Sequence, residues 1–536
     1  MDDKRNRLPA YLPVILALIL IAGMYLGFKL APVSTFNNSI LNLRSEKYNK
    51  INDIIGYIEQ DYVDSVNRKT LTRHAIHGIL EKLDPHSQYI PAHKLTEINE
   101  HLMGNFEGIG IQFRIEKDTI MVMHTIADGP SEKAGIMPGD RIVKINDSLI
   151  AGPGISNNDA IRLLKGPSGT RVDVSIYRRG LSDMVDVTIT RGIVPSTSLD
   201  FAYMINDSSG YIKLTKFSAT TYEEFSEALD TLIHQGMTQL ILDLRGNTGG
   251  YLGAAIRIAD EFLEENKLIV YTKGKNRPKN FSHATKKGRF EDGEVVVLID
   301  EHSASASEII AGAIQDNDRG IIIGRRSFGK GLVQEQLNLP DGSAVRLTVA
   351  RYYTPTGRCI QRPYDQGTEA YYKTFYERYT NGEMIAPDSI HFNDSLKFIT
   401  PSGKVVYGGG GIMPDIYVPL RAEEHEKYLN QLMHKGLIYQ FALEYTDQNR
   451  SKLQMYADGQ SFRDNFKVSN AMINALISYA DRHGVTEDPK GLQQNKNRIR
   501  LLLKSFIGRT LIGNEGFYPV YHKVDRMFLR AKEVIS

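Results

Sequence analysis

The sequence contains a single cysteine, Cys359, in 536 residues. One cysteine cannot form an intrachain disulfide, and we interpret this thiol as a small hydrophobic residue rather than as a nucleophile. No CxxC string and no HExxH string occurs, so the motifs indicate no metal and no cofactor. We therefore expect the fold and its chemistry to depend on ordinary side chains alone.

The chain also lacks an excess of either charge, because 65 basic and 63 acidic residues leave a formal net charge of +2. Proteins that bind nucleic acid carry a basic surface, so nucleic acid is not an expected partner. Hydrophobic residues make up 41% and charged residues 24%, which is typical of globular domains. A chain of this length is expected to form several domains.

Charge is missing altogether from residues 8–28, which are apolar and follow the basic residues Lys4, Arg5 and Arg7. A helix rises 1.5 Å per residue, so this stretch covers about 30 Å and can span a bilayer. The basic flank places the N-terminus in the cytoplasm. We predict a retained single-pass signal anchor, and a cleaved signal peptide is the alternative.

A serine lies where a predicted strand meets a predicted helix. Residues 295–299 are typical of a buried strand, and Ser305 begins a helical pattern that has Glu308 in its first turn. The N–H groups of a first helical turn have no partner within the helix, so the N–H of Ala306 can donate to an oxyanion. Ser303 and Ser307 are neighbouring hydroxyls, and the residues alone do not choose among the three serines.

A lysine follows the next predicted strand, residues 320–324. Lys330 is flanked by Gly329 and Gly331, and Gln334 comes four residues later. A lysine in an apolar site has a lowered pKa and can take the proton of a serine, while the glutamine can hold the amine by a hydrogen bond. The pattern favours a Ser–Lys dyad; the alternative is a solvated lysine and a serine-rich helix cap.

Two glycines, Gly249 and Gly250, follow a third predicted strand at residues 240–244. A glycine pair at the end of a strand lets the backbone approach a substrate and aim its N–H groups inward. A plain tight turn is the alternative. The phosphate-loop pattern GxxxxGK[ST] is not matched.

Residues 104–192 consist of short alternating strands separated by Gly, Pro and Asp turns, and this stretch resembles a PDZ domain. The resemblance implies that one loop holds the terminal carboxylate of a peptide, which is added as an edge strand. That loop is Gly108, Ile109, Gly110 and Ile111. The helix predicted at 156–164 would form the other wall, with Leu163 and Leu164 lining the pocket.

The strings SASASE (303–308), FGKGLVQ (328–334) and DLRGNTGG (243–250) together resemble the carboxyl-terminal processing peptidases, or tail-specific proteases, of peptidase family S41. The resemblance implies that Ser305 is the nucleophile, Lys330 the base and Gln334 the residue that orients the base. It also implies oxyanion donors at Ala306 and at the pair Gly249 and Gly250. The resemblance also makes Lys165, in the turn after the 156–164 helix, a candidate for relaying peptide binding to Lys330 or Gln334, although a solvated turn lysine is at least as good an interpretation.

The expected architecture is an α/β catalytic core of the crotonase or ClpP-like type with an inserted PDZ domain, an N-terminal transmembrane helix and a helical C-terminal extension. The predicted regions are 1–31 (cytoplasmic stub and anchor), 36–103 (helical), 104–192 (PDZ domain), 193–420 (peptidase core) and 421–536 (helical extension). Within the core, the basic connector 272–292 is predicted to be a mobile surface lid or loop.

We predict a serine endopeptidase that binds substrate C-termini and cleaves peptide bonds through an acyl-enzyme, without metal or cofactor. Its expected partners are proteins or peptides with accessible C-termini, the membrane through residues 8–28, and a second copy through the N- or C-terminal helices. The resemblance places it on the inner membrane, with the catalytic part in the periplasm. The alternatives are an inactive PDZ scaffold that binds C-termini and an acyl-processing enzyme of the crotonase-like architecture.

Overall fold

The computed structural model describes residues 13, 16–24, 50–116, 118–420, 426–456 and 458–535. The chain divides into two compact units, Met1–Gly78 and Ile79–Ser536. Residues 16–24 are helical, and 11 of the 21 residues of the predicted anchor at 8–28 lie outside the described residues. Within the part of the chain that is described, no helix has the length and apolar character needed to cross a membrane.

The next described elements along the chain are two helices, α2 (Lys50–Asp61) and α3 (Arg68–Glu81). Helix α2 has an apolar stripe, as its sequence predicts, but the stripe is exposed at Ile51, Ile54 and Tyr57. The only residue of α2 that is buried is Ile55. Exposed apolar side chains at helical spacing are typical of a surface that packs against another helix.

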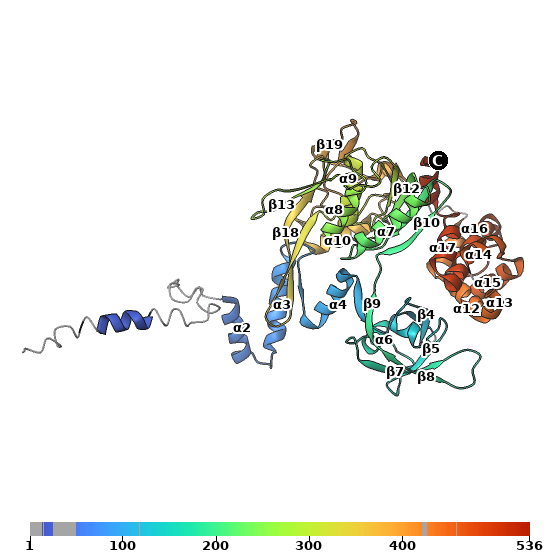
Figure 1. The fold of residues 1–536 in the computed structure, drawn as a ribbon, viewed down its shortest axis with the longest axis horizontal. Coiled ribbons are helices and arrows are strands. Elements are labelled where there is room, and N and C mark those ends of the chain that lie inside the picture. The colour runs from blue at the N-terminus through green and yellow to red at the C-terminus, as the bar shows by residue number, and fades with distance from the viewer. Residues whose placement is uncertain are drawn as a thin grey trace, which may run out of the picture. The chain divides into compact units, whose positions relative to one another are not determined.

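A six-stranded sheet forms the centre of the second unit (Figure 1). Its order is β10 (Leu199–Met204), β11 (Ser209–Leu214), β12 (Gln239–Asp243), β15 (Glu294–Ile299), β16 (Ile321–Gly324) and β21 (Ile416–Tyr417). Strand β10 is antiparallel to β11, and the other neighbours are parallel. Because parallel strands end at the same edge, the segments after β12, β15 and β16 emerge together there.

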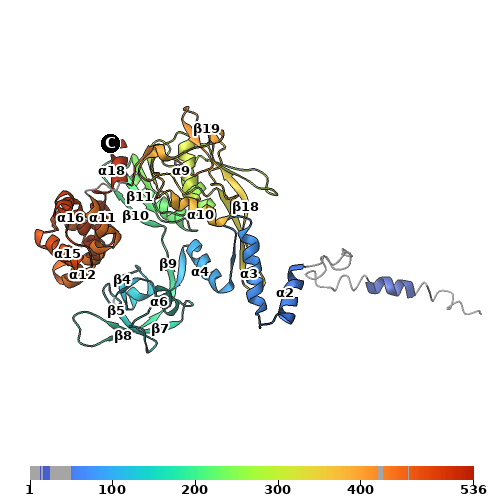
Figure 2. The same ribbon diagram turned by 180° about the vertical axis from the view of Figure 1, so that it is seen from behind.

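Both faces of this sheet are buried, which explains why its strands are apolar at nearly every position. Helices α7 (Thr221–His234), α8 (Leu252–Asp260) and α9 (Ala306–Asp316) pack on one face, in a cluster with Val295, Val297 and Ile299. The alternate residues Val296 and Leu298 face α17 (Asn514–Tyr521) and α18 (Arg526–Val534). Helix α17 is labelled in Figure 1 and α18 in Figure 2.

A second, five-stranded sheet lies beside the first and carries the segment after Lys330. Its strands are β1 (Gln88–Ile90), β13 (Leu268–Lys273), β14 (Asn280–His283), β17 (Leu332–Asn338) and β18 (Ala344–Tyr353). Strands β17 and β18 form an antiparallel pair in which Gln334 is opposite Thr348. The prediction of a surface lid or loop at 272–292 is wrong in part, because four of these residues form β14 against β13.

The β-rich segment after α4 (Ala92–Met103) forms a separate sheet in the order β3-β4-β5-β7-β8, with β6 (Ser148–Leu149) beside β5. These strands are β3 (Ile111–Glu116), β4 (Thr119–Thr125), β5 (Arg141–Ile145), β7 (Arg171–Tyr177) and β8 (Val185–Thr190). Helices α5 (Pro130–Lys133) and α6 (Asn157–Leu164) accompany them. Strands β2 (Asn105–Gly108) and β9 (Gly192–Pro195) pair where the segment leaves and rejoins the core.

The C-terminal region is helical, as predicted, and has an apolar core of its own. Its helices are α11 (Lys427–His434), α12 (Leu437–Gln448), α13 (Arg450–Leu453), α14 (Gly459–Asn465), α15 (Asn470–Arg482) and α16 (Pro489–Ile512). The remaining elements, between the second sheet and this region, are α10 (Thr368–Glu377), η1 (Pro387–Ser389), η2 (Asp394–Leu396), β19 (Lys397–Ile399) and β20 (Val405–Tyr407).

Candidate active site

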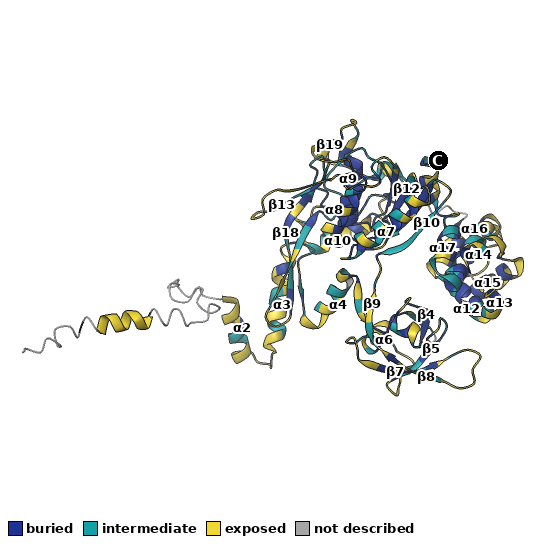
Figure 3. Ribbon diagram, in the orientation of Figure 1, coloured by how far each residue is buried: buried dark blue, intermediate teal, exposed yellow. Residues whose placement is uncertain are grey.

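Ser305 lies at the junction of β15 and α9, where the chain turns sharply. Its φ is 55° and its ψ is −111°, a conformation that side-chain-bearing residues rarely adopt. Such a residue stores about 1–3 kcal/mol of strain, which the surrounding structure must hold in place. Every residue of α9 is buried, and Figure 3 shows the helix as a dark blue segment of the core. The helix is therefore a rigid support for the serine.

The three neighbouring serines differ in what their hydroxyls do. The Ser303 hydroxyl donates to the carbonyl of Leu244 at 2.8 Å, and the Ser307 hydroxyl donates to that of Asn247 at 2.9 Å. Both of these serines are fully buried, whereas Ser305 is half-buried. Ser303 and Ser307 therefore fasten the 244–247 loop, and Ser305 is the one that a substrate can reach.

Lys330 follows β16, the strand that is parallel to β15 and adjacent to it. Its Nζ donates to Oε1 of Gln334 at 3.1 Å. The Gln334 amide is oriented from behind, since its Nε2 donates to the carbonyl of His86 at 2.6 Å. This second bond turns the amide oxygen toward the lysine. The amine therefore donates one hydrogen to Gln334 and, when neutral, keeps its lone pair for another partner.

Burial lowers the pKa of the Lys330 amine from its ordinary value of 10.5, and the positive charge of Arg346 lowers it further. Asp84 and Glu308 oppose this shift by their negative charges. Burial, together with the charge of Lys330, also lowers the pKa of His86 to about 4, so its ring is neutral near pH 7. The ring of His86 lies against Tyr371 and Phe328. The amine thus lies in a site that disfavours its charged form.

A buried carboxylate joins the serine to the lysine. Oε2 of Glu308 accepts the backbone N–H of Ser305 at 2.8 Å and the backbone N–H of Lys330 at 2.9 Å. The Tyr352 hydroxyl donates to the carbonyl of Ser305 at 3.2 Å, and the Tyr352 N–H donates to the carbonyl of Gly331. The main chains of the two predicted dyad residues are therefore close neighbours, held by the same groups.

The glycine pair predicted to hold an oxyanion lies against the serine. A Cβ added to Gly249 would lie 2.7 Å from Cβ of Ser305 and 3.0 Å from the nitrogen of Ala306. The N–H of Gly249 donates to Oδ1 of Asn247 at 2.9 Å. Within the described chain, neither Gly250 nor Ala306 has an acceptor for its N–H. These two N–H groups are therefore the ones available to a developing negative charge.

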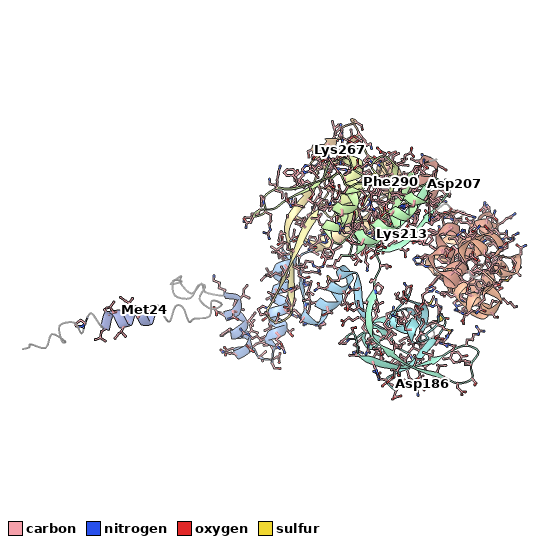
Figure 4. All side chains as sticks on the ribbon, in the orientation of Figure 1. Met24, Asp186, Asp207, Lys213, Lys267 and Phe290 are labelled. Carbon is pink, nitrogen blue, oxygen red and sulfur yellow. The ribbon has the colours of Figure 1, made fainter. Side chains whose placement is uncertain are left out.

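The loop that carries the glycines is fastened at its base by a buried charge cluster. Asp243 pairs with Arg245, which also forms a bidentate pair with Asp525 at the start of α18. Lys213, labelled in Figure 4, donates to the carbonyl of Arg245 at 3.0 Å. Although burial opposes it, the charges of Arg245 and Lys213 hold the pKa of Asp243 far below its usual range. The last helix of the chain therefore braces the loop next to Ser305.

The predicted peptide-binding loop precedes β3, which is an edge strand of its sheet and so has one side without a neighbouring strand. Gly110 has a φ of 73°, and its carbonyl accepts the N–H of Ile126 at 3.0 Å. Ile109 and Leu164 are buried in the core of this domain, while Ile111 and Leu163 are partly buried against that core. Of the six predicted residues, Gly108, in β2, pairs with Gly192, and Leu163 and Leu164 lie on α6. The other three lie at the start of β3 or directly before it.

Lys165 comes directly after α6 and does not contact the dyad. Its Nζ pairs with Oε2 of Glu100 on α4 at 2.5 Å and lies 5.2 Å from the ring centroid of Phe106. The prediction suggested Lys330 or Gln334 as its target. The structure instead connects Lys165 to the helix that leads into the β-rich domain.

Three functional features escaped the sequence interpretation: the bridge made by Glu308, the carbonyl of His86 and the charge of Arg346. The spacing S-x-x-E from Ser305 to Glu308 is a helix-capping signal that could have indicated the first of them. The other two depend on contacts across the fold. Within the described part of the chain, no group of three or more His, Cys, Asp or Glu side chains could hold a metal ion.

Comparisons with known proteins agree on one family. The family model of peptidase family S41 matches residues 208–370, that of the PDZ domain matches 108–189, and that of a family of unknown function (DUF8443) matches 428–513. The carboxy-terminal-processing protease of Bartonella bacilliformis is 36% identical over 349 residues, which are 64% of this chain and 79% of that protein. The carboxy-terminal processing protease CtpA of Bacillus subtilis is 35% identical over 334 residues, which are 61% of this chain and 71% of that protein.

Among solved structures, the photosystem II D1 C-terminal processing protease is 25% identical and covers 68% of this chain and 85% of its own. The TM-score of that match is 0.36, which is too low for a detailed superposition. The S41 match includes Ser305 and Lys330, and the PDZ match includes the loop at 108–111. Residues 514–535, which form α17 and α18, lie outside all three family matches.

Proposed function

The chain belongs to peptidase family S41 as a carboxy-terminal processing serine protease with a PDZ domain, and on this basis we propose that Ser305 is its nucleophile and Lys330 its general base. The observation that carries the proposal is the amine of Lys330: it is largely removed from water and is held by a neutral amide rather than by a carboxylate. A lysine in such a site can be neutral and can accept a proton.

The reaction begins when the Lys330 amine takes the proton of the Ser305 hydroxyl and Oγ attacks the carbonyl carbon of the scissile bond. The negative charge on the carbonyl oxygen is stabilised by the N–H groups of Ala306 and Gly250, which have no other acceptor within the described residues. Gly249 belongs to the same predicted oxyanion hole, and its bond to Asn247 keeps the loop in shape.

Collapse of the tetrahedral intermediate breaks the C–N bond, and the ammonium of Lys330 returns its proton to the leaving amine. The acyl group is now an ester on Ser305. Lys330, neutral again, takes a proton from a water molecule whose oxygen attacks the ester carbonyl. Collapse of this second intermediate breaks the ester C–O bond and releases the carboxylic acid, and the ammonium of Lys330 returns the proton to Oγ of Ser305. The serine is restored, and neither a metal nor a cofactor is needed for any step.

The PDZ domain supplies the preference for substrate ends, and we infer its binding mode from the open edge of β3. A substrate C-terminus would add as a strand along β3 with its carboxylate at the loop Gly108–Ile111. Its last side chain would enter a pocket between Ile111, Leu163 and Leu164, which pack together. For the core we propose the crotonase or ClpP-like architecture, which the parallel sheet with helices on both faces supports.

Our proposal for the location of the protein rests on its sequence rather than on its fold. We propose that residues 8–28 anchor it in the inner membrane as a single span, with the catalytic part in the periplasm. The exposed stripe of α2, at Ile51, Ile54 and Tyr57, supports a second copy of the chain as a further partner.

The test is cleavage of an unstructured protein such as casein by the wild type and by Ser305→Ala. We expect the wild type to cleave and the variant to be inactive, while both bind a C-terminal peptide with equal affinity. A slow ester substrate should leave an acyl group on the wild-type chain, and mass spectrometry of the peptides should place it on Ser305. Cleavage by Ser305→Ala at the wild-type rate would refute the assignment.

A further inference from the structure

Glu308 is a fully buried carboxylate in the first turn of α9. Each of its oxygens accepts two hydrogen bonds. Oε1 accepts the hydroxyl of Ser327 at 2.5 Å and the N–H of Gly329 at 2.7 Å. Oε2 accepts the N–H groups of Ser305 and Lys330. The four donors are three main-chain groups and one hydroxyl, and none of them is a charged side chain.

Capping a helix with a buried carboxylate costs more free energy than capping it with a neutral hydroxyl. Removal of a carboxylate from water disfavours its charged form, and burial accordingly raises the pKa of Glu308, although its hydrogen bonds oppose the shift. Helix α9 could begin with a single neutral hydroxyl, as α15 does at Ser469. A buried carboxylate that accepts hydrogen bonds from two separate segments indicates that it holds both segments in place.

The two elements are those that carry the proposed nucleophile and base. Ser305 ends the turn after β15, and Lys330 lies in the segment between β16 and β17, 25 positions later in the sequence. One oxygen atom fixes both main chains, so a displacement of either segment breaks a bond to a buried charge. The strained backbone of Ser305 needs such a restraint, because its conformation is unfavourable by itself.

We propose that Glu308 is a positioning residue of the peptidase reaction, which sets the separation of Ser305 and Lys330 by binding both backbone N–H groups with one carboxylate oxygen. The proposal rests on the Ser–Lys mechanism above. Glu308 touches no substrate and exchanges no proton. It acts through the positions of the two groups that do.

Its charge has a second effect, on the protonation of Lys330. The charged and titratable groups that act on this amine are Glu308 from α9, Arg346 from β18, and Asp84 and His86 from the segment before β1. The negative charge of Glu308 favours the ammonium form. Its removal should therefore lower the pKa of Lys330 and move the acidic limb of the rate profile to lower pH. It should also weaken the support for the ammonium that forms during the reaction.

Two substitutions separate the bridge from the charge. In Glu308→Gln the amide oxygen can still accept from Ser305 and Lys330, because the Ser327 hydroxyl can turn and accept from the new NH₂ group. The N–H of Gly329 and the O–H of Ser327 then lose their acceptor on residue 308. In Glu308→Ala both the bridge and the charge are lost. A matched control is Glu301→Ala, which removes another buried carboxylate, paired with Arg325 and remote from both Ser305 and Lys330 in its hydrogen bonds.

The experiment measures kcat and KM for a peptide that carries a free C-terminus, from pH 5 to pH 10, together with the melting temperature of each variant. We expect kcat of Glu308→Ala to fall about 100-fold with KM within twofold of the wild type, since a displacement of 1 Å has that effect. Glu308→Gln should lose less than Glu308→Ala, and the acidic midpoint of both should lie below that of the wild type. Glu301→Ala should lose stability but keep kcat and the midpoint.

A folded Glu308→Ala protein with the kcat of the wild type would overturn the proposal. If that variant does not fold, Glu308→Gln decides, and a kcat and an acidic midpoint both equal to those of the wild type overturn the proposal. The proposed mechanism fails in a different way, namely when Ser305→Ala or Lys330→Met remains active. A wild type that cleaves nothing overturns both, whereas inactivity of Ser305→Ala with full activity of Glu308→Ala overturns this inference alone.

Discussion

Two lysines of this protein, Lys330 in the catalytic core and Lys165 in the PDZ domain, have opposite surroundings. Lys330 is largely buried, its amine is bound by the Gln334 amide, and burial lowers its pKa. Lys165 has a side chain that is 31% exposed and is paired with the carboxylate of Glu100 at 2.5 Å. The same residue type thus has a neutral hydrogen-bond partner in one place and a charged partner in the other.

The difference shows that the protonation of a lysine depends on its hydrogen-bonding partner as much as on its burial. A neutral amide holds an amine in place without stabilising its charge, whereas a carboxylate beside the amine would keep it protonated. The comparison also distinguishes the region around Lys330, which is held firmly, from the region around Lys165, which is held more loosely. The site at Lys330 is held by part-buried hydrogen bonds of its main chain and its amine, while a single, partly exposed ion pair of small energy joins Lys165 to α4.

Lys330→Met should remove the base and give the largest effect of any single change. Because a positioned general base contributes about 10²- to 10⁴-fold, kcat/KM should fall by that amount with peptide binding to the PDZ domain unchanged. The substitution should also stabilise the fold. The folded state disfavours the protonated lysine, so the gain in melting temperature should be full at low pH and should shrink as the pH rises toward 10.5.

A variant that kept the wild-type rate would show that Lys330 is not the base. A melting temperature below that of the wild type at pH 7 would show that the amine is not held in an unfavourable environment. Lys165→Met is the matched control, because it makes the same side-chain change at a lysine whose amine has a carboxylate partner instead of an amide.

Gly249→Ala should have the next largest effect, on the loop that faces Ser305. The residue has a φ of 96°, and the new Cβ would lie 2.7 Å from Cβ of Ser305. Displacement of the loop should cost a donor to the oxyanion, so kcat should fall about 10²- to 10³-fold. Gly246→Ala is the control: its φ of 71° is equally unsuited to alanine, but its Cβ would contact nothing within 4 Å. Equal rates for the two variants would contradict the oxyanion assignment.

Gln334→Glu should turn the surroundings of Lys330 into those of Lys165. The new carboxylate would favour the ammonium and raise the pKa of Lys330, typically by 1–3 units. Activity should then be lost near pH 7, by about 10-fold or more, and should return as the pH rises. Gln334→Met, which adds no charge, should lower the rate without moving the profile upward. A profile of Gln334→Glu that coincides with the wild type would mean that the amine does not titrate in the reaction.

Lys165→Ala should have the smallest effect of the four. A half-exposed ion pair contributes about 1 kcal/mol or less, so we expect at most about a fivefold fall in the cleavage that a bound C-terminus stimulates. Peptide affinity should stay the same, and Glu100→Gln should reproduce the change. An unchanged rate in both variants would remove the ion pair from any account of how the PDZ domain influences the core.

Much of the frame around the site could be predicted from local sequence. The apolar runs at 295–299 and 320–324 are strands in the structure, and the helix after Ser305 begins at Ala306. These elements are readable because both faces of their sheet are buried and their apolar runs are continuous. The spacing of four residues between Lys330 and Gln334 likewise suggested the hydrogen bond that the side chains form.

The parts that could not be predicted depend on residues far apart in the chain. The carbonyl that orients Gln334 belongs to His86, 248 positions away, and the pair that braces the glycine loop joins Arg245 to Asp525 across 280 positions. Helices α17 and α18 cover the second face of the catalytic sheet, although their sequence shows only that they are helices. Periodicity reveals an apolar face but not which surface it covers.

The central claim is that Lys330 is neutral when Ser305 attacks, and the pKa of its amine tests this most directly. Isotopic labelling of lysine side chains, with Lys330→Met to assign the resonance, would allow the amine to be titrated by NMR in the inactive Ser305→Ala protein. The account predicts a midpoint below the ordinary lysine value of 10.5, and a lower midpoint still when Glu308 is replaced by Gln. A midpoint at or above 10.5 would contradict it.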